Sequence, residues 1–274
     1  GSGTRATGGS TATGNRTGGQ AMKWTRSWIA GLAALVVVLS GCVSDAELKE
    51  KAKGHIRIGE ANIQAGQYPQ ALKALQEAEK LTPDDPKVHY DLGLAYDRME
   101  FIDEAVKEFQ KAIALKPDYS EALNYLGTIY LEKQGKYEEA IVLFKRALAN
   151  PLYETPALPL YNMGRACVAK GDLKGAYASF SEAIRKEPRT HLMPVLELNL
   201  GVIDYRQGIY LEAERHLQKS VERAPNLAEA HYWLGMTQMQ LRKRKEAAES
   251  FRKVIQLAPD SEWAAKSREN LSRL

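Results

Sequence analysis

The chain has 274 residues, of which 44% are hydrophobic, and this content supports a sizeable core and excludes an intrinsically disordered protein. Its 38 basic and 34 acidic residues give a formal charge of +4, which would suit an anionic partner such as nucleic acid. Four of the basic residues, however, precede residue 42 in a stretch without acids, and the remainder carries equal numbers of both signs. We therefore expect no nucleic-acid partner.

Residues 1–21 form a Gly- and Thr-rich segment without a large apolar residue. Such a composition cannot bury enough surface to fold, so we expect this segment to be disordered. Because the first methionine of the chain is Met22, we expect the natural protein to begin there, with residues 1–21 added upstream.

Residues 22–41 have the parts of an export signal. Lys23 and Arg26 form a short basic start, and Ile29–Leu39 form an apolar run of 11 residues. Such a run rises about 16 Å as a helix, well short of a hydrocarbon core of ~30 Å. A secretory signal is therefore predicted, and a permanent transmembrane helix is the weaker alternative.

The end of this signal resembles a bacterial lipobox, with Leu39, Ser40 and Gly41 directly before Cys42. In lipoproteins with this motif the cysteine sulfur receives a diacylglycerol, the chain is cut before the cysteine, and the new amine is acylated. The resemblance implies that Cys42 carries these lipids and that residues 42–51 form a tether between the lipids and the rest of the chain. No cofactor is expected. Because Val43 follows the cysteine, the resemblance also implies that the lipoprotein is sorted to the outer membrane. An ordinary signal with a chance cysteine is the alternative.

From residue 52 the sequence repeats itself. A glycine that follows an apolar residue recurs at intervals of 34 or 37, and an alanine, then a leucine or phenylalanine, and finally a proline follow it in each unit. The glycines are Gly59, Gly93, Gly127, Gly164, Gly201 and Gly235. Apolar residues at intervals of three and four predict two helices per unit, each with one buried face. The small residues indicate that the two helices cross closely.

This pattern resembles the tetratricopeptide repeat, a helix–turn–helix unit of about 34 residues. We predict an all-α fold, a right-handed α-solenoid of six such repeats over residues 52–261. The expected repeats are 52–85, 86–119, 120–153, 157–190, 194–227 and 228–261. Residues 262–274 are expected to form a C-terminal capping helix, because the open end of such an array needs a polar cover.

No catalytic or metal-binding arrangement stands out from helix packing. His55, His89 and His231 recur at one position of the repeat, so they are expected to stack along the array rather than gather on one ion. Cys167 stands at a position where the repeat usually has tyrosine, which favours a small buried residue over a nucleophile. We predict no enzyme activity, no metal site and no small-molecule substrate.

Tetratricopeptide arrays bind other proteins, and the resemblance implies that their first helices line the binding groove. The register of the repeats gives ten candidate groove residues: Tyr90, Asp97, Asn124, Thr128, Tyr161, Arg165, Asn199, Tyr205, Tyr232 and Met236. Aromatic, arginine and methionine side chains suit a protein interface. For each residue, support of a neighbouring helix is an equally weighted alternative.

Residues 150–164, NPLYETPALPLYNMG, interrupt the repeat rhythm with three prolines. We expect none of the three to lie inside a helix, which predicts an extended link between the third and fourth repeats. This link and the following CVAKGDLKGAYASFSEAI, together with the lipobox and six repeats, resemble the type IV pilus assembly lipoproteins called pilotins. The resemblance implies a periplasm-facing outer-membrane lipoprotein that binds secretin subunits and promotes their insertion and assembly into the ring. A scaffold for another envelope process, such as β-barrel insertion or cell-wall synthesis, is the alternative.

Overall fold

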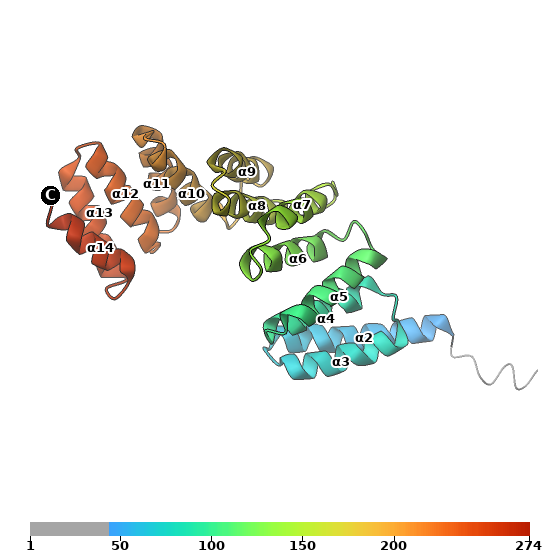
Figure 1. Cartoon of the computed structure of the whole chain (residues 1–274). Coiled ribbons are helices and arrows are strands. Elements are labelled where there is room, and N and C mark those ends of the chain that lie inside the picture. Colours follow the sequence, from blue (N-terminus) through green and yellow to red (C-terminus); the bar gives the residue numbers. More distant parts are fainter. Residues whose placement is uncertain (1–43) are drawn as a thin grey trace, which may run out of the picture. The chain divides into compact units, whose positions relative to one another are not determined.

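The computed structural model describes residues 44–274, and in this range the chain consists of helices without a β-strand (Figure 1). The helices are α2 (Asp45–Gln64), α3 (Tyr68–Leu81), α4 (Pro86–Arg98), α5 (Ile102–Leu115), α6 (Ser120–Glu132), α7 (Tyr137–Leu148), α8 (Ala157–Ala169), α9 (Leu173–Lys186), α10 (Met193–Arg206), α11 (Tyr210–Arg223), α12 (Ala228–Gln240), α13 (Arg244–Leu257) and α14 (Glu262–Leu271). The predicted all-α fold of paired helices is confirmed.

The predictions for residues 1–21, for the signal over residues 22–41 and for the lipobox that ends at Cys42 lie outside the described residues. The chain divides into a first unit, Gly1–Lys51, and a second unit, Ala52–Leu274, which contains the repeats. Within the described range, no helix combines the length and the apolar character needed to cross a bilayer.

Helix α2 begins earlier than the predicted first repeat, because a capping box starts it at residue 45. The backbone N–H of Ser44 donates to Glu47 Oε2 at 3.1 Å, and the backbone N–H of Glu47 donates to Ser44 Oγ at 3.2 Å. This reciprocal pair satisfies amide groups that a helix start otherwise leaves open. Residues 45–51, which we expected to belong to a tether, are therefore helical.

Each repeat is a pair of helices joined by a short turn. We call α2, α4, α6, α8, α10 and α12 the first helices, and α3, α5, α7, α9, α11 and α13 the second helices. In every turn one residue has a positive φ, and these residues are Gly66, Glu100, Gly135, Gly171, Gly208 and Arg242. A left-handed residue ends the first helix and turns the chain back, so that the second helix can run beside it.

Within each repeat a glycine of the first helix faces a large side chain of the second helix. A Cβ atom on Gly93 would lie 2.9 Å from Cε1 of Phe109, and one on Gly235 would lie 2.8 Å from Cε1 of Phe251. Both phenylalanines are fully buried. The expectation that small residues mark a close crossing of the paired helices is confirmed.

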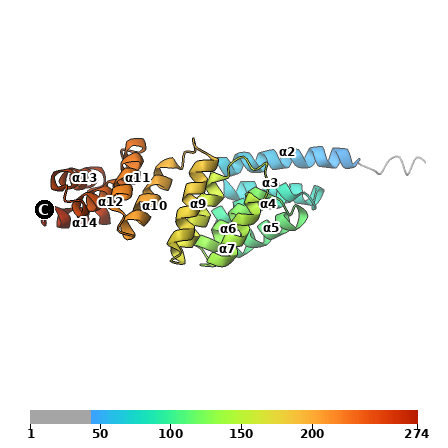
Figure 2. The same ribbon diagram turned by 90° about the horizontal axis from the view of Figure 1, so that it is seen from above.

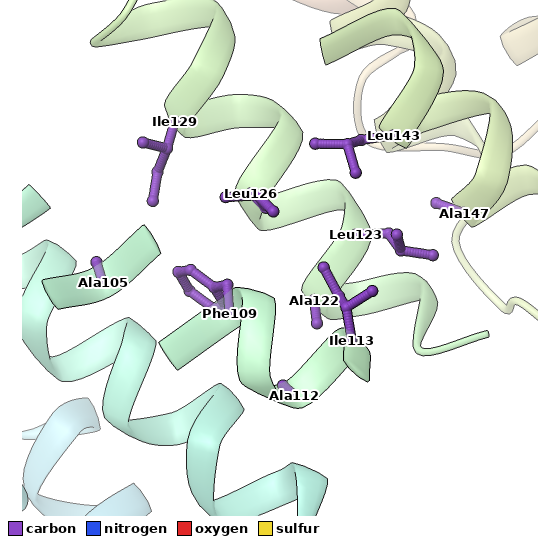
Figure 3. Packing of buried hydrophobic residues seen from close by; sticks show 10 residues of the cluster. All are labelled: Ala105, Phe109, Ala112, Ile113, Ala122, Leu123, Leu126, Ile129, Leu143 and Ala147. Atoms are coloured by element: carbon purple, nitrogen blue, oxygen red, sulfur yellow. The ribbon is translucent and has the colours of Figure 1, made fainter. Parts of the chain in front are cut away.

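Between repeats, each second helix packs against the first helix that follows it. Figure 3 shows this contact for α5 and α6, where Phe109 and Ile113 lie opposite Ala122 and Leu126. The same side chains thus bury the interior of one repeat and its border with the next. Stacking of neighbours builds the core, as is typical of repeat arrays.

Helix α8 begins where the fourth repeat was predicted to begin, and only part of the proline-rich segment 150–164 lies in the link before it. Helix α7 ends at Leu148 and α8 begins at Ala157, which leaves Pro151 and Pro156 in the link. Pro159, however, is buried in the first turn of α8, so the expectation that no proline of this segment lies inside a helix is wrong. Proline is tolerated there because the first N–H groups of a helix have no intrahelical acceptor.

Helix α14 packs against α13 at the C-terminal end of the array (Figures 1 and 2). Its Ala264 and Trp263 cover apolar residues of α12 and α13. In the register of the repeats Glu269 stands where α12 has Gly235, and Glu269 is exposed. A glutamate at this position excludes the close helix crossing seen in the six repeats, so α14 covers the last repeat without beginning another.

Candidate functional site

All ten candidate groove residues lie on first helices, from α4 to α12. Asn124 and Tyr232 are buried, and the other eight are half-buried. Half-buried side chains both pack against a neighbour and present atoms to a ligand, so burial alone does not separate the two roles. Their contacts separate them.

The central group joins α6 to α8 through polar contacts. Asn162 Nδ2 donates to Thr128 Oγ1 at 3.1 Å and to Asn124 Oδ1 at 3.4 Å. Arg165 Nη1 donates to Glu132 Oε1 at 2.7 Å and to Asn162 Oδ1 at 3.4 Å. We call these five residues the α6–α8 polar cluster. Because the amides of Asn124 and Asn162 are buried, they hold the partly exposed Thr128 and Arg165 in fixed positions.

Tyr161 extends this cluster on the surface of α8. The guanidinium of Arg165 lies over its ring, 5.7 Å from the centroid, a distance at which a cation and an aromatic face attract each other. Burial, opposed by the charge of Arg165, raises the pKa of the Tyr161 hydroxyl, which stays protonated at neutral pH. Arg165 and Tyr161 together therefore offer a cation, hydrogen-bond donors and an aromatic surface to a bound protein.

Asn162 was not among the ten predicted groove residues, although its position in the repeat could have indicated it. It stands two residues before Gly164, and the predicted Asn199 stands two residues before Gly201. Asn162 and Asn199 therefore occupy the same position of their repeats. Asn199 has a different role, since its Nδ2 donates to the carbonyl of Val195 within its own helix at 2.6 Å.

A hollow of about 390 Å³ lies beside the polar cluster, between α4 and α6. Its lining brings together the predicted residues Asp97 and Thr128, and the full set is Asp97, Arg98, Glu100, Tyr125, Thr128, Ile129, Glu132 and Lys133. Burial raises the pKa of the Asp97 carboxyl, against the opposing charges of Arg98 and Lys133. The hollow thus offers charges of both signs to a polar side chain of a ligand.

The remaining candidates serve mainly as contacts between helices. Tyr90 lies among three rings, with centroid distances of 5.9 Å to Phe109, 5.2 Å to Tyr119 and 5.8 Å to Tyr125. The ring of Tyr205 lies 5.3 Å from that of Trp233. Aromatic pairs in this range stabilise the packing of neighbouring helices.

Tyr232 and Met236 face the last helix rather than an open surface. The Tyr232 ring lies 4.9 Å from that of Trp263, and Asn270 Nδ2 lies 3.3 Å from the sulfur of Met236. Both partners belong to α14. The structure therefore gathers Asp97, Thr128 and Arg165 around one surface and leaves these two outside it.

Two of the recurring histidines bond to a proline carbonyl. His89 Nε2 lies 2.7 Å from the oxygen of Pro83, and His231 Nε2 lies 3.0 Å from that of Pro225. In each case the imidazole ties the start of a first helix to the proline that closes the previous repeat, as the packing role requires. Cys167 is buried, and burial raises the pKa of its thiol, so it is a poor nucleophile.

Family models of the tetratricopeptide repeat match residues 59–99, 90–155 and 228–261. The fold is also that of PilF from Pseudomonas aeruginosa, with a TM-score of 0.74 at 21% identity over 81% of this chain and 99% of that chain. PilW, a widely conserved type IV pilus biogenesis factor, aligns with a TM-score of 0.69 at 21% identity over 78% of this chain and 97% of that chain.

Among sequence relatives, tetratricopeptide repeat protein 16 of Homo sapiens is 24% identical over 210 residues. The alignment covers 71% of this chain but only 24% of that protein. The chain therefore spans a small part of this relative, and the two have the repeat in common.

Proposed function

We propose that this chain binds secretin subunits of the type IV pilus and promotes their insertion and assembly in the outer membrane. The chain contains tetratricopeptide repeats, and this fold typically serves as a scaffold for protein interactions. The observation that carries the proposal is the alignment with nearly the whole of PilF and PilW. The lipobox before Cys42 and the proline-rich link before α8 add independent support from the sequence.

The α6–α8 polar cluster and the neighbouring hollow are the proposed contact surface for the secretin. Arg165 and Tyr161 belong to the residue types that dominate protein interfaces, and the buried amides of Asn124 and Asn162 hold this region in place. A surface that is fixed before binding loses less conformational freedom when a partner is bound. The hollow then accepts a polar side chain of the same bound segment.

The lipids on Cys42 are the proposed membrane anchor. Each buried CH₂ group of an acyl chain contributes about 0.8 kcal/mol to membrane binding, so several chains would make attachment effectively permanent. Replacement of Cys42 by alanine is expected to abolish incorporation of labelled fatty acid and recovery in the outer-membrane fraction. Continued labelling of the variant would refute this anchor.

A deletion strain tests the proposed function directly. Loss of the protein is expected to remove the heat- and detergent-resistant secretin multimers while monomeric secretin remains, and a plasmid copy is expected to restore them. Arg165→Ala together with Tyr161→Ala is expected to fail in this complementation. The matched control is Arg185→Ala on the second helix α9, whose arginine forms an exposed pair with Glu182 and is expected to complement fully.

Normal multimers in the deletion strain would overturn the assignment to secretin assembly. A simultaneous defect in β-barrel insertion or in cell-wall synthesis would then favour a scaffold for that process. This alternative uses the same repeat fold and the same anchor and differs only in the partner.

A further inference from the structure

His89 of α4 is completely buried and has an acceptor near each ring nitrogen. Its Nε2 lies 2.7 Å from the carbonyl oxygen of Pro83, which can only accept, so Nε2 carries the proton of the neutral ring. Nδ1 then has a lone pair, and it faces Glu108 Oε2 at 2.7 Å. A lone pair and a carboxylate repel each other, so a cation must lie between them, either a proton or a metal ion.

A second carboxylate lies at the same place. The ligand atoms of Glu79, His89 and Glu108 all lie within 4.8 Å of one another. The three residues come from α3, α4 and α5, which belong to two successive repeats. The side chains of Glu79 and Glu108 are 34% and 21% exposed, so an ion can reach the site from solvent.

The last repeat provides an internal comparison in which the carboxylates are missing. His231 makes the same contact with Pro225 that His89 makes with Pro83. At the positions that correspond to Glu79 and Glu108, however, the chain has Val221 and Ser250. The packing role of the histidine therefore does not need the two glutamates.

We propose that Glu79, His89 and Glu108 bind one divalent transition-metal ion, with zinc as the ion that fits best. Imidazole nitrogen and carboxylate oxygen are both zinc ligands, and one imidazole and two carboxylates with water in the fourth position would complete its tetrahedral coordination. The bond from Nε2–H to the Pro83 carbonyl is the outer contact that fixes the tautomer and the orientation of a ligating histidine.

The two glutamate side chains must move for the site to accept the ion. Bonds of about 2.0–2.2 Å in tetrahedral geometry separate two ligand atoms by about 3.3 Å. The Glu108 carboxylate must therefore withdraw from Nδ1 by roughly half an ångström, and ligand atoms that lie as far as 4.8 Å apart must approach by up to about 1.5 Å. The rotatable bonds of the two glutamate side chains allow both movements. The bound ion would then tie the second helix of the first repeat to both helices of the second repeat.

Lys111 is a cation that competes for this site. Its Nζ lies 3.1 Å from Glu79 Oε1, and its side chain is 46% exposed. Entry of a metal ion requires this ammonium to leave Glu79, and the exposed side chain can turn into solvent. Removal of its charge is therefore expected to tighten metal binding, whereas removal of either carboxylate weakens it.

Zinc chloride is titrated into the full chain by isothermal titration calorimetry, with no histidine tag and with Cys42→Ser in every protein to remove that thiol. One zinc ion per chain is expected, with affinity at least about tenfold lower in Glu79→Gln and in Glu108→Gln and higher in Lys111→Gln. His231→Gln is the matched control and is expected to bind as the parent does. Circular dichroism confirms that each variant is folded.

Two results would overturn the proposal. One is that the parent chain binds no zinc even when the zinc concentration is about 100 times that of the chain. The other is equal zinc affinity in the parent, Glu79→Gln and Glu108→Gln, which would place the bound zinc elsewhere. The result is independent of the secretin, because the assay contains only the chain and the metal ion.

Discussion

A Cβ atom on Gly164 would lie 2.4 Å from Cε1 of Phe180, which is the closest approach between a first-helix glycine and the large side chain opposite it. Phe180 is fully buried and packs with Ala157 and Leu160 of α8 and with Leu196 of α10. The ring cannot withdraw without disturbing the border between the fourth and fifth repeats.

Gly164→Ala is therefore expected to lower the free energy of unfolding by about 1–3 kcal/mol, the usual cost of overpacking a core. Gly54→Ala on α2 is the control, because its Cβ would meet no atom within 4 Å. There the better helix propensity of alanine is expected to stabilise the chain by up to about 1 kcal/mol. Denaturation with urea measures both, and a neutral effect of Gly164→Ala would contradict the close crossing.

The turns within the repeats allow a second comparison in which the backbone is tested without side-chain contacts. Gly208 has a φ of +79°, and nothing lies within 4 Å of its hypothetical Cβ. Gly208→Ala is expected to destabilise by about 1–2 kcal/mol through left-handed strain alone.

Arg242 has a φ of 62° in the corresponding turn. Arg242→Gly removes the same kind of strain but adds freedom to the unfolded chain, so a smaller gain of about 0.5 kcal/mol is expected. Urea denaturation compares the two variants. If both lowered stability, strain at these turn residues would not explain the preference for glycine.

The repeat pattern predicted the fold because its glycines, alanines and phenylalanines report directly on helix crossing. Gly93 and Phe109 meet as the register requires, and the same contact recurs in each repeat. The start of α2 could also have been predicted, since Ser44 and Glu47 have the spacing of a capping box.

The candidate site was predictable only in part. The register placed Asp97, Thr128 and Arg165 on first helices, but it did not show which of them meet, because partners on different helices depend on how the helices rotate against each other. For the same reason the approach of Glu79 and Glu108 to His89 was not visible in the sequence. These residues lie on three helices, and only the packed structure brings their polar atoms together.

Asp204 of α10 lacks a hydrogen-bond partner for its buried Oδ2, which lies 3.8 Å from His216 Nε2. Burial raises the pKa of this carboxyl, although the nearby His216 and Arg215 oppose the rise and Glu212 adds to it. A folded-state pKa above the unfolded value means that the ionised group costs stability above that pKa. Its cost disappears as the pH falls and the folded protein takes up the proton.

Asp204→Asn is therefore expected to stabilise the chain at pH 7.5 by roughly 1–3 kcal/mol, because it replaces a buried charge by a neutral amide, which costs less to leave without a partner. This advantage is expected to shrink as the pH is lowered from 7.5 to 4, because the raised pKa lets the folded carboxyl take up its proton at a higher pH than the unfolded one. Urea denaturation at both pH values measures it, and Asp118→Asn at an exposed site is the control. An advantage that does not change with pH would contradict the role of the charge.

Glu197 also contacts His216, but its pKa is shifted in the opposite direction to that of Asp204. Burial alone would raise the pKa of its carboxyl, but the hydrogen bond from His216 Nδ1 at 2.5 Å holds it below the ordinary value. Its contribution to stability is therefore present above the unfolded pKa and is lost as the pH falls through the folded pKa. Glu197→Gln is expected to lose more stability at pH 7.5 than at pH 4, the reverse of the pH trend for Asp204→Asn.

Arg165 and Glu132 join α8 to α6 through an ion pair of 2.7 Å whose side chains are 37% and 40% exposed. An exposed pair of this kind contributes at most about 1 kcal/mol to the free energy of unfolding. Arg165→Glu is therefore expected to lower the urea midpoint only slightly. The double variant Arg165→Glu with Glu132→Arg restores the attraction with the charges exchanged. Its urea midpoint is therefore expected to return toward that of the parent.

The charge exchange separates packing from binding. If Arg165 contacts the secretin, the double variant regains stability but still fails to restore detergent-resistant multimers in the deletion strain, because the partner meets a reversed pattern of charge. Immunoblots with and without heating measure the multimers, and equal cellular amounts of both variants are required for the comparison. Full complementation by the exchanged pair would show that Arg165 and Glu132 serve only to hold α6 against α8.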